Sequence, residues 1–200
     1  NADFKVESDN RDENIIPAAS NYEAFIEKLT VYSEPYRSAG NEVKFKVQSR
    51  AENEPYTNPS SWKVTSDNKY SALLDGKGEM LNKENIIEGV REEGTSVIVV
   101  KDNKTKASVN ITLESQNTQY APLYVEWAND GKLLVIVGSA YGTFVRGGDI
   151  YLLDTDTGNS ALVYKADIEI GEEAAVIEVK EEYLAIYLMK YLDNNKTTGT

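Results

Sequence analysis

The strongest constraint on the fold lies at 127–158, where apolar runs of strand length alternate with turn signals. The turn Asn-Asp-Gly-Lys at 129–132 precedes the apolar run Leu133–Val137, and a second strand is expected at 149–154 before the polar turn 155–158. Asp and Gly favour tight turns, because the Asp side chain bonds nearby backbone and Gly accepts positive φ. The segment therefore predicts a small antiparallel sheet.

Upstream of this segment, the chain from residue 42 onward alternates apolar and polar side chains, which is typical of half-buried strands. Short strands are expected at 43–48, 62–65, 71–74, 86–90, 96–101 and 107–113. Further strands are expected at 123–127, 161–165, 175–180 and 183–190. Before them, Tyr22, Phe25, Ile26 and Leu29 recur at helical spacing and predict one short helix.

The stretch 42–113 resembles the bacterial Ig-like domains of surface adhesins of the invasin and intimin kind. The resemblance rests on Trp62, the turns at 65–68 and 75–78, Gly89-Val90, Gly94-Thr95 and the closing strand 109–112. Extra residues near 80–85 depart from the family's spacing. Members of that family act mostly as spacers or adhesion modules without chemistry, and the resemblance implies no more.

The segment 127–158 is similar to the TolB-like propeller repeat. The matching residues are Trp127, Asp130-Gly131-Lys132, Asp149-Ile150-Tyr151, Asp154, Thr157 and Gly158, whereas Ala128-Asn129 replaces the usual Ser-Pro. One blade cannot close a ring, because propellers need about four to eight blades. The segment also looks like an uncharacterised bacterial family of lone blade-like domains with a Gly-rich loop, which has no known activity to carry over.

These patterns predict an all-β protein: an Ig-like β-sandwich followed by a small antiparallel blade-like sheet domain, with one short N-terminal helix. The expected divisions are a mobile lead-in at 1–20, a short helix and connector at 21–39, the sandwich at 40–114 and the blade-like domain at 117–200.

The charge of the chain restricts its partners. It has 33 acidic and 21 basic residues and a net charge of −12. Nucleic-acid affinity comes mainly from Lys and Arg at phosphates, and no basic cluster in the sequence offsets the acidic excess, so neither nucleic acid nor an anionic membrane surface is expected to bind. No apolar run is long enough to span a membrane as a helix. The expected partner is a protein or glycan at the cell surface, and the oligomeric state stays open.

The start of the chain bears on its location. It begins at Asn1 rather than Met, and its first twenty residues are polar and charged. Such a lead-in is what remains after a signal peptide or lipid-anchor segment is removed. We therefore expect an extracytoplasmic protein, secreted or membrane-anchored as a lipoprotein through such a segment.

Cysteine and histidine are both absent. Disulfides and thiolate chemistry are thereby excluded, and the side chain best suited to proton transfer near neutral pH is missing. The turn 154–158 begins like a calcium loop, but its Gly stands fifth and Lys165 occupies the twelfth position, so an Asp-stabilised turn is the preferred interpretation. No metal and no cofactor are expected.

Catalytic patterns are weak. A serine triad lacks its base, and with 33 acidic residues a pair of carboxylates occurs by chance. We therefore expect no catalytic residue. The preferred function is a non-catalytic binding or adhesion module of unknown ligand, and the alternative is a carboxylate-based cell-wall glycan hydrolase.

The candidate binding site is the loop 138–148, which is longer than the two to five residues usual for a hairpin. Tyr and Arg are frequent binding hot spots, and glycines let a partner approach the backbone. The predicted contacts are Tyr141, Phe144, Arg146, Gly147 and Gly148. In the alternative interpretation the glycines permit a wide turn and Arg146 pairs with a carboxylate such as Asp149.

Overall fold

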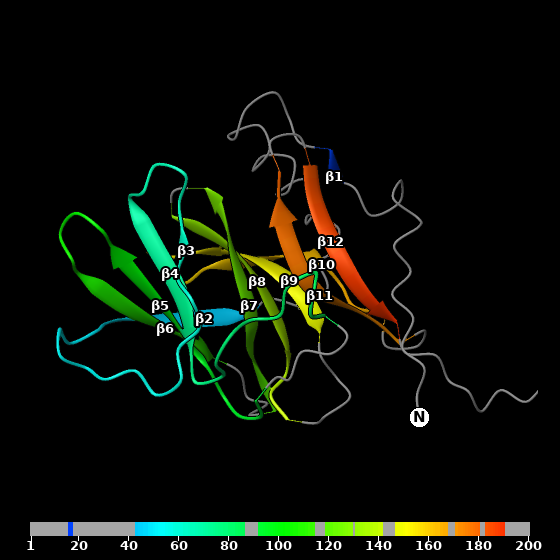
Figure 1. Ribbon diagram of the computed structural model, residues 1–200, viewed down its shortest axis with the longest axis horizontal. Helices are drawn as coiled ribbons and strands as arrows, with labels where there is room; N and C mark the ends of the chain where they lie inside the picture. The colour runs from blue at the N-terminus through cyan, green and yellow to red at the C-terminus, as the bar shows by residue number, and fades with distance from the viewer. Residues whose placement is uncertain are drawn as a thin grey trace, which may run out of the picture.

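The structure, a computed structural model, describes residues 16–17, 43–86, 92–114, 119–129, 131–141, 147–167, 171–180 and 183–190. The described residues form two antiparallel sheets (Figure 1). This confirms the predicted all-β fold class. The helix expected within 21–39 and most of the strand expected at 86–90 lie outside the described residues.

The five-stranded sheet has the order β2-β6-β5-β4-β3. Its strands are β2 (Lys44–Ser49), β3 (Lys63–Val64), β4 (Tyr70–Asp75), β5 (Val97–Asp102) and β6 (Ser108–Glu114). The period-two pattern of the sequence sets its two faces: Phe45 and Val47 pair with Leu113 and Ile111 and point into the core, and the lysines between them point outward.

The seven-stranded sheet has the order β1-β12-β11-β9-β8-β7, with β10 paired to β9. Its strands are β1 (Ile16–Pro17), β7 (Tyr120–Asn129), β8 (Lys132–Ser139), β9 (Gly148–Asp154), β10 (Ser160–Tyr164), β11 (Glu172–Val179) and β12 (Tyr183–Lys190). The sheet forks at β9, because β11 pairs with its first residue while β10 pairs with residues 150–153. Within the predicted lead-in, the described strand β1 pairs with β12.

A hydrophobic core joins the two sheets. Ala72, Leu74 and Ile98 of the five-stranded sheet pack with Trp127 and Val135 of the other sheet in one cluster. The layer that faces β2–β6 is therefore built from β7–β10. The described strands β2–β6 all belong to one sheet, and with the β7–β10 layer they form a sandwich-like arrangement. The division of the chain into two domains stays a prediction.

A second core lies between β7–β9 and the strands β11 and β12. Leu134, Ile136 and Ile150 pack there with Val176 and Ile177. In Figure 1 the cyan-to-green sheet, the β7–β10 layer and the orange strands β11 and β12 follow one another across the molecule. The layer β7–β10 is thus covered on both faces, which explains its nearly continuous apolar strands.

Backbone contacts close one corner between the facing layers. The amide of Phe45 in β2 donates to the carbonyl oxygen of Gly158 at 3.1 Å, and the Ser160 hydroxyl donates to the carbonyl oxygen of Val43. A side chain on Gly158 would meet the Phe45 carbonyl oxygen at 2.1 Å, and its φ is +75°. Glycine is required here because the turn after β9 touches the backbone of β2.

Candidate functional site

Two tyrosines are exposed at one end of β7 and β8. Tyr120 pairs in register with Ser139, and Tyr141 follows two residues later. Their exposed fractions are 44% and 45%. Tyr141, which the sequence predicted as a contact, is thus on the surface. Phe144 and Arg146 lie outside the described residues, and their role stays a prediction.

Close backbone packing explains the glycines at 147 and 148, where β9 begins. A Cβ on Gly148 would lie 2.0 Å from the carbonyl oxygen of Val137, and one on Gly147 would lie 2.3 Å from that of Ala174. Real Cβ atoms do not approach so closely, so glycine at both positions lets β8, β9 and β11 meet at the fork of the sheet. The Gly147 amide also donates to Glu173 at 3.3 Å. The binding role predicted for these two glycines stays a prediction.

A buried lysine holds the base of the loop. Lys77 is 5% exposed, and its ammonium group donates to the carbonyl oxygens of Glu92 at 2.8 Å and Ala140 at 3.2 Å. The Gly94 amide donates to the same Ala140 oxygen at 2.8 Å. A buried cation is stable only when it is hydrogen-bonded, so these contacts fix the backbone just before Tyr141.

The carboxylate of Asp149 is bonded by residues that directly follow β10. It pairs with the Lys165 ammonium group at 2.6 Å and accepts the Ala166 amide at 2.9 Å. The Tyr151 hydroxyl donates to it at 3.4 Å, and burial together with this carboxylate raises the pKa of Tyr151. The pairing of Asp149 with Arg146, the alternative weighed from the sequence, falls outside the described residues.

The turn after β9 agrees with the preferred interpretation of the sequence. One carboxylate oxygen of Asp154 accepts the Thr157 amide and hydroxyl, each at 2.9 Å, and the other receives the Lys132 ammonium group at 3.3 Å. One oxygen thus stabilises the turn, and the other pairs with the neighbouring strand β8. Among the described residues no group of three or more Asp and Glu side chains is arranged to hold a metal ion.

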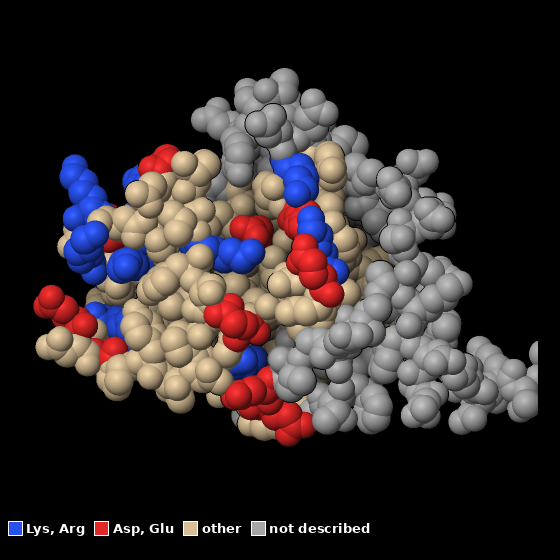
Figure 2. All heavy atoms as spheres, viewed as in Figure 1, with Lys and Arg blue, Asp and Glu red and all other residues tan. Residues whose placement is uncertain are grey.

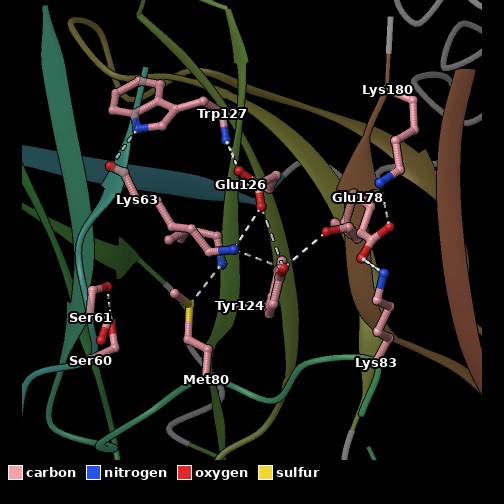
Figure 3. Close-up of polar contacts among 12 residues, drawn as sticks. Ser60, Ser61, Lys63, Met80, Lys83, Tyr124, Glu126, Trp127, Glu178 and Lys180 are labelled. Atoms are coloured by element: carbon pink, nitrogen blue, oxygen red, sulfur yellow. Dashed lines mark hydrogen bonds and ion pairs between the residues drawn. The ribbon is translucent and has the colours of Figure 1, made fainter. Parts of the chain in front are cut away.

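A second polar cluster joins β3 to β7 (Figure 3). The Lys63 ammonium group contacts Glu126 at 2.8 Å and the Tyr124 hydroxyl at 3.3 Å. Burial lowers the pKa of Lys63, but the hydrogen bond and charge of Glu126 outweigh it, so the pKa lies above its usual value. The Tyr124 hydroxyl donates to the carbonyl oxygen of Ile177 at 2.9 Å, and burial raises the pKa of Tyr124 to about 12.

The cluster continues onto β11. Glu178 pairs with Lys180 at 2.8 Å and Lys83 at 3.3 Å, and these bonds, the one from Lys180 first, hold its pKa below the usual value. Acidic and basic side chains alternate accordingly across the middle of the face in Figure 2. Because these charges are matched to one another, we interpret the row as a bridge between strands rather than as a ligand site.

Sequence reasoning missed this row. Lys63 and Glu126 are 63 positions apart, and no local pattern joins them. The available signal was Glu126 itself, a carboxylate inside the apolar strand 123–127, which needs a partner once its neighbours are buried.

Comparison with known proteins places the chain in a family. Residues 2–198 match the model described as a domain of unknown function, DUF4652. The chain belongs to this family. No curated protein matches it. The family defines no activity, and the Ig-like and TolB-like resemblances find no support in these comparisons.

One solved structure is similar to this DUF4652 protein. It is the crystal structure of a "putative conserved lipoprotein" from Clostridium novyi NT, with 26% sequence identity and a TM-score of 0.65. The match covers 76% of the present chain and 88% of the other. Within the described residues of the present chain, no helix is long and apolar enough to cross a membrane.

Proposed function

We propose that this DUF4652 protein is a non-catalytic extracytoplasmic binding module, held at the membrane as a lipoprotein, that binds a protein or glycan at the cell surface. The observation that carries the binding role is the pair Tyr120 and Tyr141, 44% and 45% exposed at one end of the β7–β8 hairpin. The description of the Clostridium novyi protein supports the location.

The tyrosine pair suits recognition because its support is rigid. The Ala140 amide donates to the carbonyl oxygen of Gln119, and the Ser139 hydroxyl donates to that of Tyr141 at 2.7 Å. Together with the buried Lys77, these bonds hold the chain beside both rings. A rigid ring with a solvent-exposed hydroxyl binds sugars and peptides at a low entropic cost, because the side chain loses little conformational freedom on contact.

The alternative, a carboxylate-based glycan hydrolase, needs a carboxylic acid whose pKa is raised so that it can donate a proton. Hydrogen bonds lower the pKa values of Asp102, Asp154 and Glu178. A lowered pKa suits anions held in hydrogen bonds rather than proton donors. We therefore place the binding function first.

The test compares tyrosines of similar exposure. Binding to purified insoluble cell-wall glycan is measured by co-sedimentation for the wild type, Y120A/Y141A and the control Y183A, whose ring is 38% exposed on β12. The double variant should lose about tenfold or more in affinity, as expected for two hot-spot rings, and the control should bind like the wild type.

Three results would contradict the proposal. One is equal binding by the wild type and the double variant, and another is no glycan binding by the wild type together with no binding to intact cells. The third is release of soluble sugar fragments in step with protein concentration, which would favour the hydrolase.

A further inference from the structure

Two hairpin ends of the five-stranded sheet bring four lysines together. Lys69 ends the turn between β3 and β4, and Lys101, Lys104 and Lys106 surround the β5–β6 hairpin. The Asn103 amide donates to the carbonyl oxygen of Lys69 at 2.8 Å, and its side chain donates to that of Asn68 at 3.0 Å. These bonds fix the two ends to each other. We call the group Lys69, Lys101, Lys104 and Lys106 the lysine tip.

The backbone at Lys106 is unusual for a lysine. Its φ is +67°, in the left-handed region where glycine and asparagine are favoured. The amide of Lys106 donates to the carbonyl oxygen of Asp102 at 2.9 Å, which holds this conformation. The Lys106 ammonium group donates to the carbonyl oxygen of Asn103 at 2.6 Å, which closes the turn and holds the charge at the exposed hairpin end.

The tip carries more positive than negative charge. Two carboxylates lie near it, and both are engaged with backbone: Asp67 accepts the Lys69 amide at 2.9 Å, and Asp102 accepts the amides of Lys104 and Thr105. Among the described residues, the ammonium groups of Lys101, Lys104 and Lys106 form no ion pair with a carboxylate. In Figure 2 basic side chains gather at the left end of the face, where Figure 1 shows the β5–β6 hairpin.

Aromatic rings continue the tip along the outer face of the same sheet. The Lys101 ammonium group lies 4.6 Å from the ring centre of Trp62, which meets Tyr56 edge-on at 6.2 Å. Tyr56 is 41% exposed, and the Arg50 guanidinium, which is buried and paired with Glu54 at 3.1 Å, lies 4.3 Å under its ring and supports it. The lysine cations and the rings of Trp62 and Tyr56 thus follow one another on this surface, which suits an extended ligand that alternates anionic groups with apolar or sugar-like units.

We propose that the lysine tip binds a linear polymer that carries repeated phosphate groups. Each exposed ammonium group can donate hydrogen bonds to one phosphate and displace that phosphate's counterions, which gives an affinity that falls as salt rises. The site is separate from the tyrosine pair and goes beyond the proposed function. Neither depends on the other.

The net charge of −12 does not prevent this binding. Charges in salt solution are screened over about 8–10 Å, so acidic residues on the other layers act weakly at the tip. Three of its lysines lie close together in the sequence at 101–106, and folding adds Lys69 to them.

The test uses inorganic polyphosphate as the probe, with binding measured by fluorescence anisotropy at low and high salt. The variant K104E/K106E is compared with K44E/K46E, which changes two exposed lysines of β2 in the same sheet by the same charge. K104E/K106E should weaken binding about tenfold or more at low salt, and the matched control should change it less than about threefold. A third variant, K106G, should melt no lower than the wild type, because glycine relieves the positive φ, and should still bind more weakly.

Each of the following results supports or contradicts polymer binding by the lysine tip. Retained polyphosphate binding by Y120A/Y141A separates the tip from the proposed glycan site. Equal losses in the two double-lysine variants would overturn the tip as a site, because binding would then follow net charge alone. The absence of wild-type binding, or tip-dependent binding only to vesicles of anionic phospholipid, would overturn the polymer as the ligand.

Discussion

The indole nitrogen of Trp127 donates a hydrogen bond of 2.9 Å to the backbone carbonyl oxygen of Lys63. Trp127 is 5% exposed and lies in β7, whereas Lys63 lies in β3, the edge strand of the facing sheet. The Tyr70 ring stacks on the indole, with centroids 6.1 Å apart. One side chain therefore fills the core between the sheets and satisfies an edge-strand carbonyl.

This contact predicts that the two tryptophans of the chain differ in their effect on stability. W127F should lower the free energy of unfolding by about 1–3 kcal/mol, because it leaves the Lys63 carbonyl unsatisfied and underfills the core. W62F, at the half-buried outer position, should cost under about 1 kcal/mol. Urea unfolding followed by circular dichroism measures both. Equal losses would mean that the interlayer contact is unimportant.

The buried Tyr124 predicts a loss of stability in alkali. Its hydroxyl ionises near pH 10.0 in the unfolded chain and near 12 in the folded protein, and the pKa of Lys63 is also raised. For both groups the unfolded state loses its proton first, so stability present below pH 10 falls as the pH rises. Over pH 10–12 the wild type should lose roughly 2 kcal/mol more than Y124F, from the two-unit shift of Tyr124 discounted for solvent. Y183F, at an exposed site, should behave as the wild type, and parallel pH curves for Y124F and wild type would refute the assignment.

The fork of the seven-stranded sheet predicts a strict need for glycine at position 148. In G148A the new Cβ would overlap the Val137 carbonyl oxygen, so β8 and β9 would have to separate. We expect a loss of about 3 kcal/mol or more, or no folded protein. G94A is the comparison, because no atom lies within 4 Å of its Cβ and only a positive φ opposes it. Thermal melts of the two variants test this, and a melting temperature of G148A at or above that of G94A would contradict it.

The Asp154 turn predicts a contribution to stability that is lost in acid and does not involve calcium. Burial raises the pKa of Asp154, but hydrogen bonds from Thr157 and the Lys132 ammonium group outweigh it, so the pKa is lowered. The contribution is therefore present above the ordinary value of 3.8 and is lost as the pH falls through the lower folded value. D154N should be less stable than wild type at pH 7, and the gap should close toward pH 2. Adding calcium or a chelator should leave the melting temperature unchanged, and a rise with calcium would restore the metal-loop hypothesis.

Local sequence patterns determined most of the strands and several turns of this protein. Alternation along β2 placed Phe45 and Val47 inward, and the Asp154–Gly158 turn forms as its residues predict, because its hydrogen bonds span only three or four positions. The exposed Tyr141 was also identified from the sequence. Such features depend on neighbours in the chain, which a single sequence records directly.

Only the tertiary structure decided which layers face each other and which distant residues meet. The pairing of Lys63 with Glu126, the packing reason for Gly147 and Gly148, and the union of Lys69 with the 101–106 hairpin all join segments that no local period relates. The sequence alone does not say which strands cover the apolar face of β2–β6. In the folded chain β7–β10 cover it, and sequence could not show this because apolar burial is non-directional and any sheet of fitting shape can provide it.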